Sequence, residues 1–382
     1  MPDAQPDTER LRILLTVHHR LERGAGAPGA TLALADALER RGHRVEVVGF
    51  GLVGTSRGAT LDAVRFPHAV ARLVRRRFEL GDLDVVDASS GDLAYVAPLR
   101  VRAASTAVFT RSHGLEHLAD AARRRGAAAG ELDLRHRYSL YHGGWRLREV
   151  ARSFRAADGA LLLNDAEVTF ATEVLGVPTE RVWRTSSPVR DAFIDLPRAP
   201  QRDVLVLGPA SWRKGGDVSV RVVETVLRAD PFATASWAGL DDPGATAEAF
   251  GDDVRARLAV SGRYGVDEEA QLLATHRVLL FASRFEGLPL TLLEAMVAGI
   301  AVVGTDIPGV RDLLGDGAGV LAPEGHVEGL AGAVRSLLAD EARRETCGAS
   351  AVKAAAAHGT ESVVDGVLEA YWTVLEVKRP MR

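Results

Sequence analysis

The chain has 382 residues, of which 47% are hydrophobic and 26% charged, and its formal net charge is −4 at pH 7. No apolar run approaches the roughly twenty residues that a membrane-spanning helix needs, and the acidic balance argues against a protein that binds nucleic acid. The single cysteine, Cys347, excludes an intramolecular disulfide and a cysteine-based metal site. The length favours two domains, and the first apolar run, residues 11–17, is too short for a signal peptide, so we expect a cytoplasmic protein.

Strand and helix patterns alternate through the first half of the chain. A glycine-rich loop is expected at residues 24–29, and the helical pattern that follows, residues 30–41, ends at Gly42, a residue suited to a helix C-cap. Such alternation is typical of a parallel sheet. Short apolar runs predict its strands at residues 12–17, 45–50, 85–87, 107–110 and 159–163.

Two prolines in the polar stretch 195–201 interrupt this alternation and predict a linker between domains. The pattern then restarts with strands at 203–207, 234–238, 278–282 and 300–303 and helices at 217–228, 327–338 and 362–377. We therefore predict an α/β protein with two Rossmann-like domains, residues 1–195 and 196–360, whose parallel sheets face each other across a cleft. Residues 361–382 are expected to form a C-terminal helix that packs back on the first domain.

Two glutamates follow the apolar run at 278–282. Glu286 opens a Gly-Pro turn, and Glu294 lies inside the next helical run. This places polar groups at the C-terminal end of a buried strand, where open α/β sheets bind ligands. If residues 286–294 were all helical, the acids would lie about 12 Å apart at the usual rise per residue, suited to the two ends of an extended ligand. The plainer alternative is a helix cap at Glu286 and a solvated Glu294.

The turn between these acids also suits an anionic or polar ligand. Gly287 lets a ligand approach the backbone, and Pro289 is well placed near a first helical turn. The amide groups around Leu288 and Leu290 then point out of the helix start, where phosphate or sugar oxygens are stabilised.

The order of these features resembles the retaining GT-B glycosyltransferases of family 4. The resemblance implies a GT-B fold, a nucleoside-diphosphate sugar as donor and no metal or other cofactor. It also implies that Glu286 orients the donor sugar, that Glu294 holds the ribose and that residues 287–290 contact the donor. The segments that carry it are Glu286-Gly287-Leu288-Pro289-Leu290, Glu294-Ala295-Met296-Val297-Ala298-Gly299, Gly304-Thr305-Asp306 and, with a shortened acid, Pro308-Gly309-Val310-Arg311-Asp312.

A second segment, residues 207–216, resembles the basic turn of the same family. Lys214-Gly215 matches its Lys-Gly, whereas Pro209 stands where the family has an arginine. The resemblance implies that Lys214, with Arg213 in partial compensation, stabilises the charge of the leaving diphosphate. The alternative is a solvated basic turn.

In the first half, Gly26 lies in the loop that the resemblance places near the donor phosphates and the acceptor. Gly24, Gly26 and Gly29 also fall at the offsets of a dinucleotide-binding fingerprint, which raises a dehydrogenase as a rival. That rival is disfavoured because the loop starts about seven residues after the strand and the second strand lacks a terminal acid. The resemblance also implies that His113, which follows the strand at 107–110, lies near the donor sugar and the acceptor. The alternative is a loop histidine with a backbone partner.

Residues 123–155 contain nine arginines interleaved with aromatic residues. A solvated helical face is the plain interpretation. The alternative is contact with an anionic or lipid-linked acceptor, or with the inner membrane surface as a peripheral protein.

The resulting hypothesis is a retaining glycosyltransferase with a carbohydrate, lipid-linked or small-molecule acceptor, in which Glu286, His113 and Lys214 are catalytic. Two alternatives stay open: a GT-B sugar phosphorylase or epimerase, and an inactive homologue that serves as a partner subunit. The inactive homologue is motivated by Pro209 and by Ser186-Ser187-Pro188-Val189 where the family has an Asn-Gly. The spacing of motifs specifies neither the nucleotide and sugar nor the acceptor.

Overall fold

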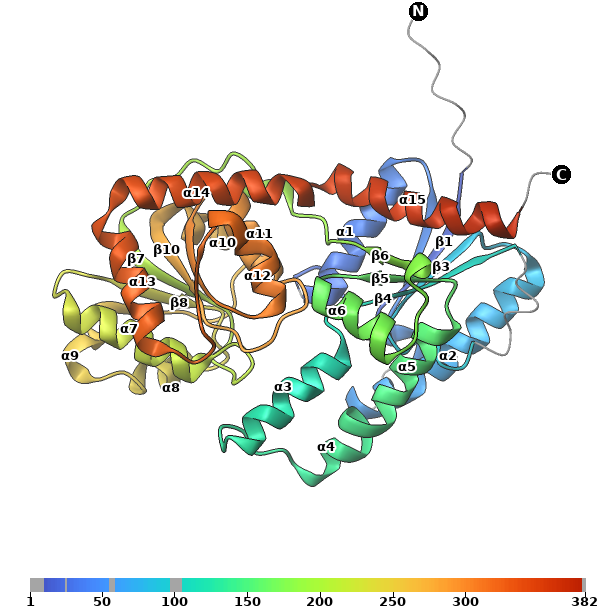
Figure 1. Ribbon diagram of the computed structural model, residues 1–382, viewed down its shortest axis with the longest axis horizontal. Coiled ribbons are helices and arrows are strands. Elements are labelled where there is room, and N and C mark those ends of the chain that lie inside the picture. Colours follow the sequence, from blue (N-terminus) through green and yellow to red (C-terminus); the bar gives the residue numbers. More distant parts are fainter. Residues whose placement is uncertain (1–9, 25, 55–58, 97–104, 380–382) are drawn as a thin grey trace, which may run out of the picture. The chain divides into compact units, whose positions relative to one another are not determined.

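The computed structural model describes residues 10–24, 26–54, 59–96 and 105–379 (Figure 1). Contacts divide the chain into two compact units. Unit 1 comprises the described parts of Met1–His117, Arg135–Pro188 and Thr360–Arg382, and unit 2 comprises Leu118–Leu134 and Val189–Gly359. The stretch at 195–201 thus lies inside unit 2, and helix α3 (Glu116–Ala128) contributes residues to both units.

Unit 1 contains a six-stranded parallel sheet in the order β2-β1-β3-β4-β5-β6. Its strands are β1 (Arg12–Thr16), β2 (Arg44–Val48), β3 (Val85–Ser89), β4 (Ala107–Arg111), β5 (Gly159–Leu162) and β6 (Val182–Arg184). Its helices include α1 (Gly26–Arg40), α2 (Ala59–Leu80), α4 (His136–Leu140), α5 (Arg146–Ala156), α6 (Asp165–Thr169) and α15 (Thr360–Lys378).

Unit 2 contains a second six-stranded parallel sheet, in the order β12-β11-β10-β7-β8-β9. Its strands are β7 (Arg202–Leu207), β8 (Ala235–Ala238), β9 (Leu258–Val260), β10 (His276–Phe281), β11 (Ala301–Thr305) and β12 (Val320–Ala322). The helices are α7 (Gly216–Ala229), α8 (Pro243–Glu248), α9 (Asp252–Arg255), α10 (Val266–Thr275), α11 (Leu290–Val297), α12 (Pro308–Leu314), α13 (Val327–Ala339) and α14 (Glu341–Ala355). The predicted α/β class with two parallel sheets is confirmed.

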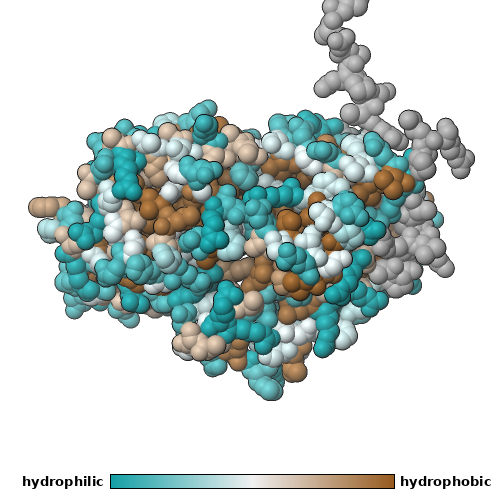
Figure 2. All heavy atoms as spheres, viewed as in Figure 1, coloured by the Kyte–Doolittle hydropathy of each residue, from teal (hydrophilic) through white to brown (hydrophobic). Residues whose placement is uncertain are grey.

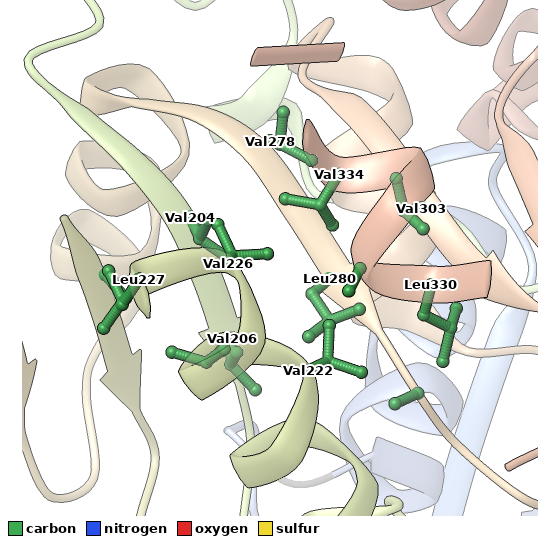
Figure 3. Packing of buried hydrophobic residues seen from close by; sticks show 14 of the residues in the cluster. Val204, Val206, Val222, Val226, Leu227, Val278, Leu280, Val303, Leu330 and Val334 are labelled. Atoms are coloured by element: carbon green, nitrogen blue, oxygen red, sulfur yellow. The ribbon is translucent and has the colours of Figure 1, made fainter. Parts of the chain in front are cut away.

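The core of unit 2 explains why its strands are almost wholly apolar. Figure 3 shows α7 and α13 covering one face of the sheet, with valines and leucines from both helices meeting those of β7, β10 and β11. A second apolar cluster, which includes Leu293 and Met296 of α11, packs the other strand residues. Strands that are buried on both faces consist of continuous apolar runs in the sequence, and for this reason they could be predicted.

The glycine-rich segment differs from its prediction. Helix α1 begins at Gly26, four residues earlier than expected, so Gly29 lies within the helix; Ala25 lies outside the described residues. A Cβ at Gly29 would lie 2.6 Å from the carbonyl oxygen of Arg23, so glycine allows the preceding turn to pack on the helix. The three-residue strands β6, β9 and β12 were missed because each is too short for its pattern to stand out, and their residues are mostly half-buried or exposed.

Helix α15 packs on α1 and β4 of unit 1. Its Tyr371 hydroxyl donates to Asp87 on β3 over 2.5 Å, and Arg111 on β4 donates to the same carboxylate. All three side chains are buried. Because removal of one partner would leave an uncompensated buried charge or donor, this group fixes the C-terminal helix to the sheet.

Each sheet has one point at which consecutive strands are added in opposite directions. In unit 1 this switch point lies between β1 and β3, and in unit 2 it lies between β7 and β10. In open α/β sheets, ligands bind outside the carboxyl ends of the strands at such a switch point.

Candidate functional site

The switch point of unit 2 brings together the two motifs that are far apart in the sequence. Lys214 lies on the turn between β7 and α7, and Glu286 lies on the loop between β10 and α11. The Lys214 ammonium group is 2.7 Å from Oε1 of Glu286, and Nη1 of Arg213 is 2.9 Å from Oε2. Both cations therefore converge on one carboxylate whose residue is only 8% exposed.

The environment of Glu286 keeps it ionised. Burial opposes ionisation, but the charges of Lys214 and Arg213 outweigh it and lower the pKa of the Glu286 carboxyl. Ser283 adds a hydrogen bond from its hydroxyl to Oε1 over 2.9 Å. Glu286 is thus an acceptor of hydrogen bonds rather than a proton donor, and the two cations beside it remain partly accessible to an anion.

Glycines allow this close meeting of loops. Gly215 has φ +66°, and a Cβ there would lie 1.9 Å from the carbonyl oxygen of Ala282 at the end of β10. Gly309, near the start of α12, lies against the Glu286–Gly287 backbone, since its Cβ would be 2.3 Å from the Gly287 oxygen. Only glycine fits such positions, so the backbone of three separate motifs packs into one corner.

Arg284 braces the turn that carries Lys214, and the sequence did not identify it. Its guanidinium makes two hydrogen bonds to Asp217, of 2.6 and 2.7 Å, and a third to the carbonyl of Trp212. Trp212 in turn lies against Gly126, and its indole N–H donates to Glu131. Residues 118–134 therefore pack with unit 2 and support its switch point.

The second acid, Glu294, lies on α11 and has different partners. Nε of Arg190 donates to Glu294 over 2.6 Å, and Nη2 of the same arginine is 2.7 Å from Glu269 on α10. Helix α11 begins at Leu290 after the N-cap Pro289, so the 12 Å spacing derived for a continuous helix does not apply. Leu288 lies in the loop before it and is half-buried, as is Leu290. Arg190 was not singled out because the segment that follows Ser186 was interpreted as structural, and Glu269 lies in no recognisable motif.

Unit 1 holds the other two predicted site residues. Gly26 is the first residue of α1 and lines a cavity of about 450 Å³ with His19, Arg20 and Phe50. His113 follows β4, and its Nε2 is buried without a hydrogen-bond partner in the described part of the chain. Burial, with a smaller contribution from the charge of Arg111, lowers the pKa of His113 to about 4, so its ring is neutral at neutral pH.

The switch point of unit 1 carries a polar pair that the sequence analysis missed. His18 follows β1 and Asp92 follows β3, and Nδ1 of the histidine is 2.6 Å from the aspartate. Asp92 is fully buried and also accepts a hydrogen bond of 2.7 Å from Thr16. The pair of histidines directly after the first strand, and the polar run ending in Asp92, were signals that could have identified this site.

The basic stretch divides into buried and exposed residues. Arg146 is buried, donates to the Ser90 carbonyl and lies 3.2 Å from Glu116, so it is part of the unit 1 interior. Leu140 and Trp145 are 68% and 48% exposed. Figure 2 shows apolar residues lying at the surface among hydrophilic ones on the visible face.

The described residues contain neither a metal-binding cluster nor a membrane-spanning helix. Within them, no group of three or more histidine, cysteine, aspartate or glutamate side chains has a geometry that could hold a metal ion. Nor does any helix among them combine the length and the apolar composition that a membrane span requires.

The chain resembles known proteins in sequence and in fold. Residues 201–340 match the family described as "Glycosyl transferases group 1". The phosphatidyl-myo-inositol mannosyltransferase of Mycolicibacterium smegmatis is 24% identical over 87% of this chain and 86% of its own length. Among solved structures, sucrose-phosphate synthase from Thermosynechococcus elongatus has a TM-score of 0.73 at 16% identity, over 96% of this chain and 100% of that one. Anabaena HepE in complex with UDP-glucose has a TM-score of 0.68 at 17% identity, over 95% and 100% of the two chains. Together these findings support a glycosyltransferase with the GT-B fold.

Proposed function

We propose that this protein transfers a sugar from a nucleoside diphosphate to an acceptor hydroxyl, with retention of the anomeric configuration and without a metal ion. The observation that carries the proposal is the convergence of Lys214 and Arg213 on Glu286 at the switch point of unit 2. The resemblance to family 4 enzymes supports retention, and the relatives named above support a nucleotide-sugar donor.

In this proposal the two cations act on the leaving group. Bond cleavage builds negative charge on the diphosphate, and Lys214 and Arg213 would stabilise it there. Glu286, kept ionised, would accept hydrogen bonds from the hydroxyls of the donor sugar. The bound diphosphate would then take over part of the contact that the two cations make with Glu286. Residues 287–290 would line the donor, and Glu294 would bind the ribose.

Acceptor binding is proposed for unit 1. The neutral His113 can donate or accept a single hydrogen bond to a sugar hydroxyl without adding charge. At the switch point, Asp92 holds His18 through Nδ1, which leaves Nε2 as the ring nitrogen that would meet a hydroxyl group. Gly26 would allow either substrate to approach the start of α1.

The exposed part of the basic stretch supports an anionic or lipid-linked acceptor. Arg137, Arg148 and Arg152 are exposed on α4 and α5, whereas Glu149 is buried. We propose that this face contacts an anionic membrane surface. The protein should then sediment with phosphatidylglycerol vesicles and not with phosphatidylcholine vesicles. Arg148→Glu should weaken this sedimentation. Arg335→Glu makes the same change at an exposed position of α13 and should not weaken it.

Thermal denaturation with a panel of nucleoside diphosphates tests the donor site. A ligand that binds only the native state raises its melting temperature, so UDP, GDP or ADP should do so for the wild-type protein. Lys214→Ala should abolish the increase, whereas Lys353→Ala, which removes an exposed lysine on α14, should keep it. A panel without any effect, or an equal increase in Lys214→Ala, would contradict the proposal. Phosphate-dependent cleavage of a glycoside would instead indicate a phosphorylase.

A further inference from the structure

One guanidinium links two buried acids beside the proposed ribose site. Arg190 precedes the short 3-10 turn Asp191–Phe193 and reaches Glu294 on α11 and Glu269 on α10. The two glutamates are each only 3% exposed, while the side chain of Arg190 is 32% exposed. Its guanidinium carbon also lies 4.8 Å from the ring centre of the buried Phe193, which restricts its orientation.

A single cation cannot neutralise two buried carboxylates. Burial, together with the charge of Glu294, raises the pKa of Glu269, and burial also raises the pKa of Glu294, although Arg190 opposes this. Of the two acids, Glu269 is therefore the one that burial and its neighbour's charge favour in the protonated form. Tyr264 also lies close to this pair, and burial raises the pKa of its hydroxyl, so it stays neutral.

The arrangement restricts Glu294 before any ligand arrives. A free glutamate side chain loses rotamer freedom when it binds a ligand, and that cost is smaller when the side chain is already held. A carboxylate offers about four lone-pair positions, and the contact with Nε of Arg190 uses one of them. A hydrogen bond with Glu269 uses another, and neutral hydroxyl donors would occupy the positions that are left.

We propose that Arg190 and Glu269 are positioning residues that hold Glu294 ionised and oriented for the two hydroxyls of the donor ribose. The inference rests on the proposed function, because it assumes a nucleotide at this site. Arg190 acts through Glu294 and not on the reacting atoms. This positioning role explains why an arginine and a second buried acid, neither of which binds a diphosphate, lie beside α11.

The test compares ribose with deoxyribose. Affinities are measured by titration calorimetry for whichever of UDP, GDP or ADP binds best, and for its 2′,3′-dideoxy form. Hydrogen bonds to a charged group predict a preference for the ribose of about 10- to 100-fold in the wild-type protein. Arg190→Ala should lower ribonucleotide affinity to that of the dideoxy form and leave dideoxy affinity unchanged. Arg190→Lys keeps the positive charge but loses the planar guanidinium that reaches both acids, so it should retain part of the preference for the ribonucleotide.

Two further variants separate positioning from stability. Glu269→Gln imitates the protonated acid and should keep the preference for ribose. Arg228→Ala, which removes surface ion pairs on α7, is the matched control and should change neither affinity. If Arg190→Ala unfolds, Arg190→Lys still provides the comparison, because it leaves a cation between the acids.

Each contrary result has its own meaning. Full ribose preference in both Arg190 variants would overturn the inference, and so would tighter ribonucleotide binding in Arg190→Ala, which would make Arg190 a competitor of the ribose. Equal binding of the two nucleotides by the wild-type protein would overturn it while leaving the donor site in place. If none of the nucleotides binds, the proposed function itself fails.

Discussion

Both sheets have a switch point beside their first strand, between β1 and β3 in unit 1 and between β7 and β10 in unit 2, and the two points carry different side chains. In unit 2, Lys214 and Arg213 face one ionised carboxylate, and both cations stay partly accessible. In unit 1, His18 is bound to an aspartate that is fully buried. We propose that Lys214 and Arg213 make the unit 2 switch point an anion site, and that His18 and Asp92 make the unit 1 switch point a hydroxyl site. On this proposal the side chains at the strand ends, and not the sheet, decide what is bound.

Glu286→Gln tests the anion site most strongly. Loss of the carboxylate charge frees Lys214 and Arg213 for the diphosphate, so nucleoside-diphosphate affinity should stay equal or increase. Sugar transfer should nevertheless fall by about 10²–10³-fold, because the group that orients the donor sugar is lost. Calorimetry and initial rates separate the two effects. A parallel loss of affinity and rate would mean that Glu286 is mainly structural.

Gly215→Ala tests whether the geometry of that site depends on the close contact with β10. The new Cβ would clash with the Ala282 carbonyl in a backbone conformation that disfavours alanine, so unfolding free energy should fall by about 3 kcal/mol. Gly332→Ala, on the exposed face of α13 with nothing within 4 Å, should stabilise the protein by about 0.5–1 kcal/mol. Chemical denaturation measures both. If the two substitutions changed the unfolding free energy equally, the turn at Gly215 would be able to relax around the new Cβ.

The pH dependence of stability tests whether His113 of unit 1 is neutral in the folded protein. The pKa of His113 is about 4 in the folded protein, against about 6.5 when unfolded, so the unfolded state takes up the proton first as pH falls. Stability from this group is complete above about pH 6.5 and declines toward pH 4, by at most about 3 kcal/mol. His113→Gln should flatten that part of the profile, and exposed His136→Gln should not.

Asp92→Asn tests the hydroxyl site with the smallest expected effect. The neutral amide keeps the shape but weakens the hydrogen bonds to His18 and Thr16, so unfolding free energy should fall by about 1–2 kcal/mol. Nucleotide affinity should not change, since Asp92 belongs to unit 1. A loss of nucleotide affinity as large as that of Lys214→Ala would remove the distinction between the two switch points.

Much of the architecture could be predicted because buried parallel strands leave continuous apolar runs, and β10 and β11 were located within one or two residues. Strands as short as β12, with three residues, leave an apolar run too short to be distinguished from other short apolar stretches. The start of α1 was misplaced because a glycine cluster usually indicates a loop, whereas here Gly29 serves packing inside a helix.

The amino-acid sequence alone determined the α/β class, the two parallel sheets and the position of Glu286, Glu294 and Lys214 along the chain, since periodicity and spacing are local properties. Which cation pairs with which acid was decided by tertiary structure. Arg190 is 104 residues from Glu294, and Arg284 is 67 from Asp217. Contacts over such separations depend on how strands are ordered in the sheet, and no local pattern encodes that order.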